Sequence, residues 1–320
     1  MTALLTAGLG HLGAQDVNGD ASPVPASRPA LQWYDLGVHG RFAYSRPGFL
    51  QSVRNAPGTI VGTVTFAVRR ERLTDWLVLV GGTAAAIAAD EWLVDRTREA
   101  ARAIGLPPNH PSVDVRLGPL KILPLPTTLG SAAYFLGDGA MSLGIAGGFF
   151  AFGVAKADNR AFRTASQITE SLLAAGTFTQ VIKHVTGRQT PSEASEPRGR
   201  WNWFPSLAEY NDNVPGHDAF PSGHLAVATA TVEVIAMNYP ERKFVRPVGY
   251  SLLAILSFAM INNGVHWASD YPLAVALGRT VAGVAVRDGR ATGGTPTSGG
   301  ATIQPLLAPG RIGVLIPVGR

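Results

Sequence analysis

Four long runs of the chain carry no charged side chain and are mostly apolar, namely residues 76–89, 139–155, 171–182 and 247–265. A helix that is apolar on every side is buried either in a large core or in a membrane. The runs span 12 to 19 residues, and a membrane-crossing helix needs about 20. The pattern therefore favours buried helices of a compact bundle, and a membrane protein with short helices is the alternative.

Start and stop signals place the helices more closely. The expected helices are one or two between Asp75 and Gly105, one or two over 128–156, one from about 159 to Gly187, and single helices at about 223–239, 245–263 and 266–286. Prolines predict loop or broken helix over 106–128, and the mixed segment 33–72 predicts short helices and loops. We expect an all-α fold, a helical bundle of about six main helices with a short β-hairpin-like C-terminal tail around Pro309-Gly310.

Composition divides the chain into three parts. Residues 1–32 are a signal-like or disordered N-terminus and linker, residues 33–288 form the helical domain, and residues 289–320 are a Gly-rich linker and β-like tail. The start of the chain resembles a secretory signal cleaved after Ala14, but it has no Lys or Arg before the apolar run, so a disordered terminus is the alternative. We expect an exported, periplasmic or membrane-associated protein.

Charge and cysteine content limit the partners. Charged residues are 15% of the chain, the net charge is +5, and the pI is near 9.7. A basic balance favours anionic partners such as a phospholipid or a phosphate ester. The chain has no Lys/Arg run typical of nucleic-acid binding, so no nucleic-acid partner is expected. It has no cysteine, which excludes disulfides and Cys-ligated metals.

Three short segments carry candidate chemistry: "KHVTGRQTP" at 183–191, "PSGH" at 221–224 and "NNGVHWASD" at 262–270. Ser222 and Gly223 open a predicted helix, and a helix N-terminus binds anions through its unpaired amides. His224 follows in the first turn, where it could protonate a leaving oxygen.

The outer two segments supply a nucleophile and a cation. His266 and Asp270 are four residues apart, so on a helix they share one face. An aspartate bonded to one imidazole nitrogen makes the other nitrogen a better nucleophile. Lys183 adds a compact positive charge. Together the three segments predict a phosphoryl-transfer site.

In order and spacing, these motifs resemble the type 2 phosphatidic acid phosphatase and vanadium haloperoxidase superfamily. The family pattern is Lys-x6-Arg-Pro, then Pro-Ser-Gly-His, then Ser-Arg-x5-His-x3-Asp. The resemblance implies an α-helical bundle in which His266 forms a phosphohistidine, Asp270 orients it and His224 is the general acid. It implies that Lys183, Ser222 and Gly223 hold phosphate oxygens. It implies no metal or other cofactor, with vanadate only as an inhibitor or in the haloperoxidase alternative.

Two positions depart from the pattern. Thr190 stands where the family has the arginine of the first motif, and Ala259-Met260 stand where it has Ser-Arg. Both guanidinium groups that would clamp the phosphate are therefore missing. Removing one preorganised oxyanion donor typically costs about 10²–10³ in rate.

Arginines nearby in the sequence could compensate. Arg188 lies just past the predicted helix end, and Arg198 and Arg200 lie in the loop before "WNWF". On a continuous helix Arg188 would lie about 140° round from Lys183, so it needs the break at Gly187 to reach the site. We expect Arg188 and Arg200 to bind substrate.

The predicted function is that of an acid-phosphatase-like phosphoric ester hydrolase. Its substrate would be a phosphate monoester or diphosphate, lipid or isoprenoid linked, because the surroundings are apolar and the chain is basic. We expect it to associate with a membrane. The alternatives are a catalytically degenerate binding or scaffold protein, and altered chemistry in the same pocket such as vanadate-dependent halide oxidation.

Overall fold

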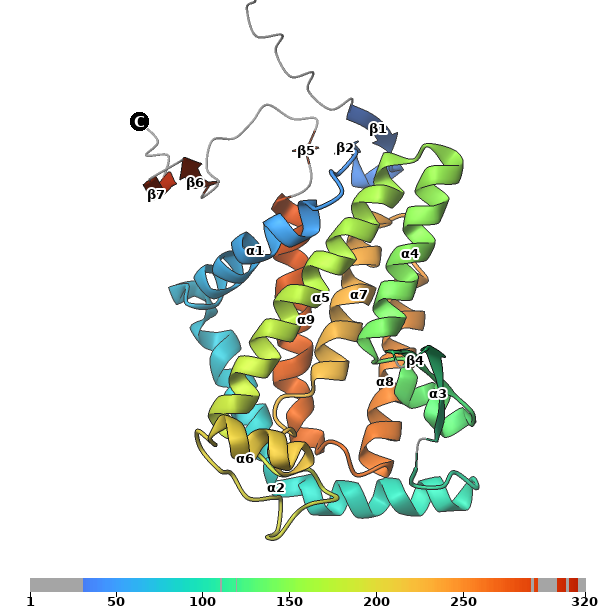
Figure 1. Cartoon of the computed structure of the whole chain (residues 1–320), viewed down its shortest axis with the longest axis vertical. Coiled ribbons are helices and arrows are strands. Elements are labelled where there is room, and N and C mark those ends of the chain that lie inside the picture. Colours follow the sequence, from blue (N-terminus) through green and yellow to red (C-terminus); the bar gives the residue numbers. More distant parts are fainter. Residues whose placement is uncertain are drawn as a thin grey trace, which may run out of the picture.

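The computed structural model describes residues 31–109, 111–118, 120–288, 291–292, 304–308 and 311–315. The signal-like segment up to residue 30 and most of the linker 289–300 lie outside the described residues. The described α-helices are α1 (Gln51–Ala67), α2 (Leu73–Ala103), α3 (Leu129–Phe135), α4 (Gly139–Lys156), α5 (Asn159–Thr186), α6 (Leu207–Asp212), α7 (Gly223–Asn238), α8 (Val245–Asn262) and α9 (Tyr271–Asp288). The prediction of an all-α bundle is confirmed (Figure 1).

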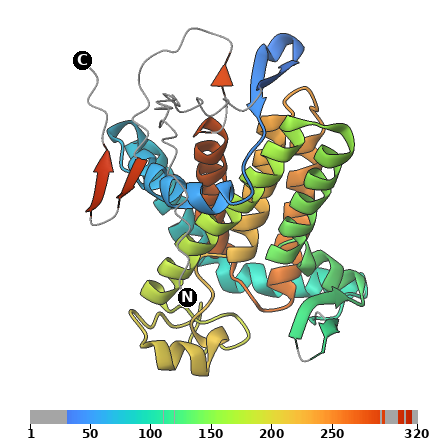
Figure 2. The same cartoon turned by 45° about the horizontal axis from the view of Figure 1, so that its top comes forward.

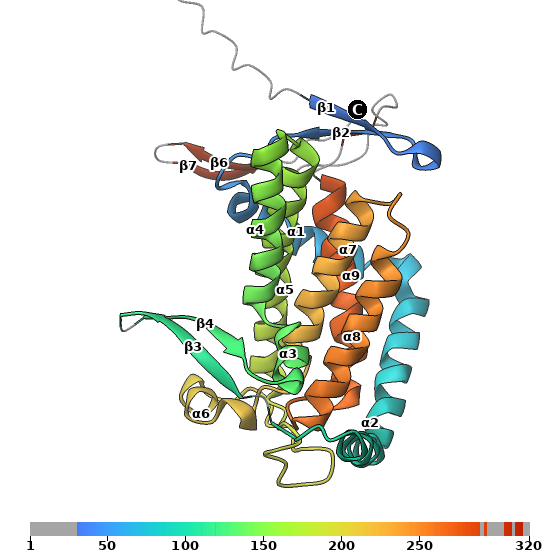
Figure 3. The same cartoon turned by 90° about the vertical axis from the view of Figure 1, so that its right-hand side faces the viewer.

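The bundle is built around α7, which packs against α4, α5, α8 and α9 (Figure 3). Its buried face includes Leu225 and Ala226, which contribute to one core cluster with Leu256 of α8 and Val281 of α9. The helices α7 and α9 lie very close together, because a Cβ added at Gly278 would stand 2.4 Å from the Ala226 carbonyl oxygen. Small residues at this crossing are what allow the backbones to approach.

Two segments contain more regular structure than predicted. The segment 33–72, where short helices and loops are expected, contains most of the hairpin of β1 (Leu31–Asp35) and β2 (Arg41–Ser45) and the 17-residue helix α1, with Pro57 inside the helix. Residues 106–128 include the β3 (Ser112–Leu117) and β4 (Leu120–Pro126) hairpin. Prolines are tolerated in a two-stranded ribbon because each strand has an outer edge that needs no ladder hydrogen bond. The packing of α1 against α5 compensates for the hydrogen bond that Pro57 removes.

Further strands lie near the C-terminus. The short β5 (Ala291–Thr292) pairs with β2, and β6 (Gln304–Ala308) pairs antiparallel with β7 (Arg311–Leu315). Figure 2 shows the β6–β7 pair outside the helices. The predicted hairpin-like tail is confirmed.

Three helical segments of the described residues are long and apolar enough to cross a membrane: Arg70–Ala103, Gly139–Lys156 and Val245–Asn262. Only 11%, 17% and 39% of their most apolar windows are buried inside the protein. The expectation that these runs are buried in the bundle is therefore wrong for α2 and α4. Their apolar side chains, such as Leu77 and Phe152, point outward because too few neighbouring helices cover them.

One end of the bundle collects the segments that carry the motifs. The connection between α5 and α7, which includes α6, lies at this end. The C-terminal part of α2, the whole of α3 and the β3–β4 hairpin lie there too (Figures 1 and 3). The 3-10 turn η4 (Ala268–Asp270), which leads from α8 into α9, packs against α2 at this end.

Candidate active site

His266 lies in the turn between α8 and α9, ahead of η4, and is 1% exposed. Its Nδ1 lies 2.8 Å from the Ala219 carbonyl oxygen and 3.4 Å from Asp270 Oδ2. The expectation that His266 and Asp270 share a helix face is wrong, since His266 precedes the helix and the backbone turns between them. Both neighbours of Nδ1 are acceptors, so Nδ1 carries the proton and Nε2 keeps its lone pair.

Asp270 is held rigidly, because both of its carboxylate oxygens accept strong hydrogen bonds. Oδ2 accepts from the Trp267 amide at 2.7 Å, which closes the η4 turn, and Oδ1 accepts from Arg188 Nη1 at 2.7 Å. Asp270 is 0% exposed. A buried carboxylate is stable only when it is paired and hydrogen-bonded, and these contacts supply that.

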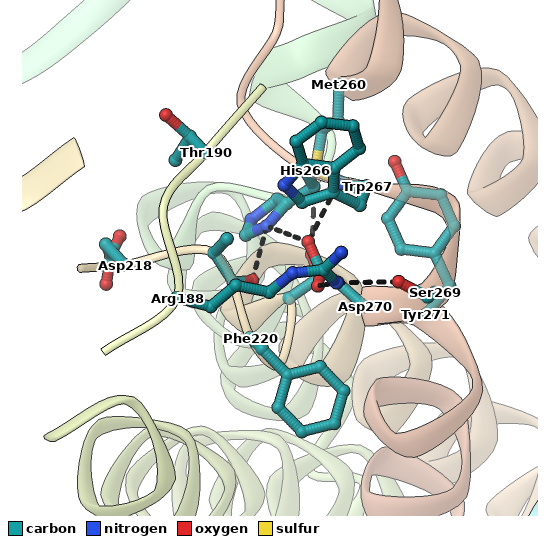
Figure 4. A network of polar contacts seen from close by, with 12 residues as sticks. Arg188, Thr190, Asp218, Phe220, Met260, His266, Trp267, Ser269, Asp270 and Tyr271 are labelled. Atoms are coloured by element: carbon teal, nitrogen blue, oxygen red, sulfur yellow. Dashed lines mark hydrogen bonds and ion pairs between the residues drawn. The ribbon is translucent and has the colours of Figure 1, made fainter. Parts of the chain in front are cut away.

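Arg188 is the centre of a buried ionic network (Figure 4). Nη1 donates to Asp270 and to the Ser269 hydroxyl, while Nη2 donates to Asp90 at 2.7 Å. Nε and Nη2 also donate to the carbonyl oxygen of Arg198. All five guanidinium donors are thus used, and Arg188 is 0% exposed. The expectation that Arg188 binds the substrate is not met: it holds Asp90 and Asp270 in place.

A glycine turn places Arg188 in this position. Gly187 ends α5 in the left-handed conformation, with φ of 50°, and a Cβ there would stand 2.1 Å from the Asn202 carbonyl oxygen. The chain therefore reverses at Gly187. The guanidinium then lies 4.9 Å from the Trp201 ring and 5.2 Å from the Trp267 ring. Both rings shield it from water and contribute cation–π attraction.

The second motif forms the start of α7. The Ser222 hydroxyl accepts from the Leu225 amide at 3.3 Å and donates to Met260 Sδ at 3.7 Å, and Ser222 is 0% exposed. Ser222 is therefore the helix cap, with its hydroxyl directed at Met260. The predicted part of Ser222 in holding phosphate oxygens stays a prediction.

His224, in the first turn of α7, faces the buried histidine. The two ring centroids of His224 and His266 are 6.2 Å apart, and Tyr134 of α3 lies 4.8 Å from His224 on ring centroids. Burial, with smaller contributions from Asp138 and Asp218, raises the pKa of Tyr134 to about 12. The Tyr134 hydroxyl is consequently neutral at physiological pH, and its ring lies beside His224.

Lys183 reaches the same helix start and is 4% exposed. A Cβ placed on Gly223 would lie 3.7 Å from Lys183 Nζ, so the ammonium group lies directly beside Gly223. Lys183 is also paired with Asp218, with Nζ and Oδ1 2.7 Å apart. Tyr210 donates to the same Asp218 oxygen at 2.6 Å, and burial followed by this bond raises the pKa of Tyr210 well above its usual range.

The positions that lack the family arginines contain neutral side chains away from solvent. Thr190 is 4% exposed and shares a hydrogen bond with the Ser192 hydroxyl. Met260 is 0% exposed and belongs to the core cluster of α7, α8 and α9. The Arg200 side chain is exposed, and the backbone amide and carbonyl of Arg200 are both hydrogen-bonded to Gln189. The expectation that Arg200 compensates for the lost arginines is not met by this geometry.

The site therefore contains two histidines, a lysine and a set of buried carboxylates. Among the described residues, no group of three or more His, Asp or Glu side chains could hold a metal ion. Of the predicted residues, the structure brings together His266, Asp270, His224, Lys183 and Gly223.

Comparison with known proteins supports the motif assignment. The family model of the PAP2 superfamily matches residues 165–292, which include all three motif segments. The resemblance predicted from the motifs is confirmed by this match. The crystal structure of Aquifex aeolicus LpxE is similar, with 16% sequence identity and a TM-score of 0.37, covering 49% of this chain and 83% of that chain. No curated protein matches the chain.

Sequence reasoning missed three residues of this site: Asp90, Asp218 and Tyr134. Asp90 had a usable signal, because it is a carboxylate that directly follows an uncharged apolar run of α2. Asp218 and Tyr134 had none, since a loop aspartate and a tyrosine on an apolar helix are common. Only the tertiary structure shows that they adjoin Lys183 and His224.

Proposed function

We propose that this protein is a phosphohydrolase that removes phosphate from a monoester or diphosphate through a phosphohistidine on His266. The observation that carries this proposal is the convergence of His266, His224 and Lys183 on the start of α7. The histidine rings are 6.2 Å apart on centroids, and the lysine ammonium lies beside Gly223. The match of residues 165–292 to the PAP2 superfamily supports a phosphatase of lipid phosphates.

The proposed reaction has two steps. The lone pair of His266 Nε2 attacks phosphorus in line, the bond from phosphorus to the leaving oxygen breaks, and His224 donates a proton to that oxygen. Water then attacks the phosphohistidine, His224 accepts its proton, and inorganic phosphate leaves. The Ala219 carbonyl and Asp270 keep Nδ1 protonated and stabilise the charge that forms on the ring.

Phosphate oxygens would be held by Lys183 and by the amides of the first turn of α7. A helix start is a ready anion site, and Gly223 presents no side chain that would block it. Because Asp218 already pairs with Lys183, an entering phosphate must compete with this carboxylate. We further propose that vanadate, which resembles the transferred phosphoryl group, inhibits by occupying the same position.

The substrate class follows from the surroundings of the site. The outward-facing apolar residues of α2 and α4 suit a membrane, and a pocket of about 770 Å³ with mainly apolar walls lies between α3, α8 and the segment that follows α2. That pocket adjoins the site through Leu136, which directly precedes Gly137, and a Cβ on Gly137 would meet His224 at 2.6 Å. We therefore propose a lipid or isoprenoid phosphate or diphosphate as substrate and a membrane-associated, exported or periplasmic location.

Phosphate release tests the proposal directly. The wild-type chain and His266→Ala are incubated with an aryl phosphate and with an isoprenyl diphosphate, and inorganic phosphate is measured. The wild type should release phosphate, and His266→Ala should lose at least about 10³ in rate, as expected for a nucleophile. His224→Ala should still form an acid-labile phosphoenzyme from the aryl phosphate, whose leaving group needs little protonation. Equal rates for the wild type and His266→Ala would refute the mechanism.

One observation favours a second candidate function, that of a binding or scaffold protein that retains His266 and Asp270 without catalysis. Met260 is fully buried at a family arginine position, and all the donors of Arg188 are used by acceptors of the protein itself. Such a protein would bind a lipid phosphate without releasing phosphate. Vanadate binding that persists in the absence of turnover, with the same affinity in His266→Ala, would favour this candidate.

A further inference from the structure

A second cavity, of about 780 Å³, lies between α1, α2 and α9, and none of the site residues described above lines it. We refer to it as the arginine pocket. Its walls include the cationic side chains of Arg72, Arg279 and Arg287 and the apolar side chains of Phe66, Trp76 and Leu79.

The charges of the arginine pocket are unbalanced. Arg72 pairs with Asp75, which is the only acidic side chain among the lining residues. The guanidinium groups of Arg72 and Arg287 lie 3.9 Å and 5.2 Å from the Phe66 ring centroid. Arg279 is 62% exposed, and its ion pair with Glu233 spans 3.9 Å, at the outer limit of such contacts. Three cations against one lining carboxylate favour an anionic ligand.

A buried hydroxyl provides a second, independent indication of a ligand. Thr63 lines the same pocket and is 4% exposed. Its Oγ1 has no hydrogen-bond partner in the described part of the chain. Buried hydroxyls in folded proteins are nearly always satisfied, so an unpaired one in a pocket wall indicates a missing acceptor. A phosphate or ester oxygen is such an acceptor.

The rest of the wall is apolar, which distinguishes the ligand from free phosphate. Leu273 and Leu277 of α9 and Leu79 of α2 line the pocket, and the outer face of α2 is itself exposed and apolar. We propose that the arginine pocket binds an acidic phospholipid, with the phosphate on the arginines and an acyl chain along α2 and α9. This site is separate from the proposed reaction and does not depend on it.

Fluorescence quenching tests the assignment on the full-length chain. The protein is reconstituted into phosphatidylcholine vesicles that contain brominated phosphatidylglycerol or brominated phosphatidylcholine. The quenching of Trp76 is the difference between the quenching measured in the wild type and that measured in Trp76→Phe. In the wild type, brominated phosphatidylglycerol should quench Trp76 several-fold more strongly than brominated phosphatidylcholine, and this ratio is the lipid preference. Arg72→Gln and Arg287→Gln should each lower this preference roughly fivefold, the contribution of one cation near an anionic lipid.

The chain offers a matched control. Arg72–Asp75 and Arg96–Glu99 are both exposed i,i+3 ion pairs of the same helical segment, but only Arg72 lines the pocket. Arg96→Gln should therefore keep the wild-type preference, and Arg287→Lys, which preserves the charge, should keep most of it.

Four results would overturn the assignment. The first is equal quenching by the two lipids in the wild type. The second is an equal loss of preference in Arg72→Gln and Arg96→Gln, and the third is an equal loss in Arg287→Lys and Arg287→Gln. The fourth is displacement of phosphatidylglycerol by soluble glycerol phosphate, which would show that the pocket binds the phosphate alone. Because no result depends on catalysis, failure here is distinguishable from failure of the hydrolase proposal.

Discussion

Replacing Arg188 by methionine tests the view that this arginine supports the site from within and does not touch substrate. The change leaves Asp90 and Asp270 without their shared cation while both are 0% exposed. Breaking a buried ion pair by removing one partner costs about 3–5 kcal/mol. At about 2–4 °C per kcal/mol for a domain of this size, the melting temperature should fall by roughly 6–20 °C.

Arg246 provides the control for this experiment. It also pairs with a buried carboxylate, that of Glu233, at 3.0 Å, but its own side chain is 52% exposed. Glu233 also accepts a hydrogen bond from Tyr250 at 2.8 Å, so Arg246→Met leaves it partly satisfied. Because Arg246 itself is exposed to water, Arg246→Met should lower the melting temperature less than Arg188→Met. Both variants are melted in the same detergent and buffer as the wild type.

Kinetics separate the two roles of Arg188. If it positions Asp270, and through it His266, then Arg188→Met should lower kcat by about 10- to 100-fold, because small misplacements of reacting groups have effects of this size. KM should change little. A rise in KM with kcat unchanged would identify Arg188 as a substrate ligand. If Arg188→Met melts within about 2 °C of the wild type, the loss is no larger than the ~1 kcal/mol that an exposed ion pair contributes, and the buried network is refuted.

Three further predictions follow from single contacts. Gly187→Ala should lower the melting temperature by several degrees relative to Gly176→Ala, because a Cβ at Gly187 would stand 2.1 Å from a backbone oxygen whereas Gly176 has open space; equal melting would contradict the turn geometry. Asp218→Asn should tighten inhibition by phosphate about fivefold, because Lys183 would lose a competing carboxylate 2.7 Å away; unchanged inhibition would exclude Lys183 as a phosphate ligand. The pKa of Tyr134 is raised from 10.0 to about 12, so it stabilises the fold below pH 10 and this contribution is lost as pH rises toward 12. Tyr134→Phe should flatten the decline in melting temperature above pH 10, and an unchanged decline would show that other groups cause it.

The sequence by itself determined the class of fold and the segments that carry the chemistry. Uncharged apolar runs predicted most helices, and the glycine after Thr186 predicted the end of one of them. Both signals are local, because they depend only on neighbouring residues of the chain or on the φ of one residue. Order and spacing of the motifs predicted the PAP2 superfamily, and the family match confirms it. The β3–β4 hairpin and the length of the helix around Pro57 were missed because pairing and packing outweighed the local effect of proline.

Only the tertiary structure decided how the charges of the site are arranged. No local pattern connects Asp90 with Arg188, which are 98 residues apart in the chain, or Lys183 with Asp218. Arg188 is buried in an ionic network because two carboxylates from distant elements meet at its guanidinium group. Burial makes an unpaired charge far more costly than an exposed one, so ion pairs formed on folding determine which cations stay available to a substrate.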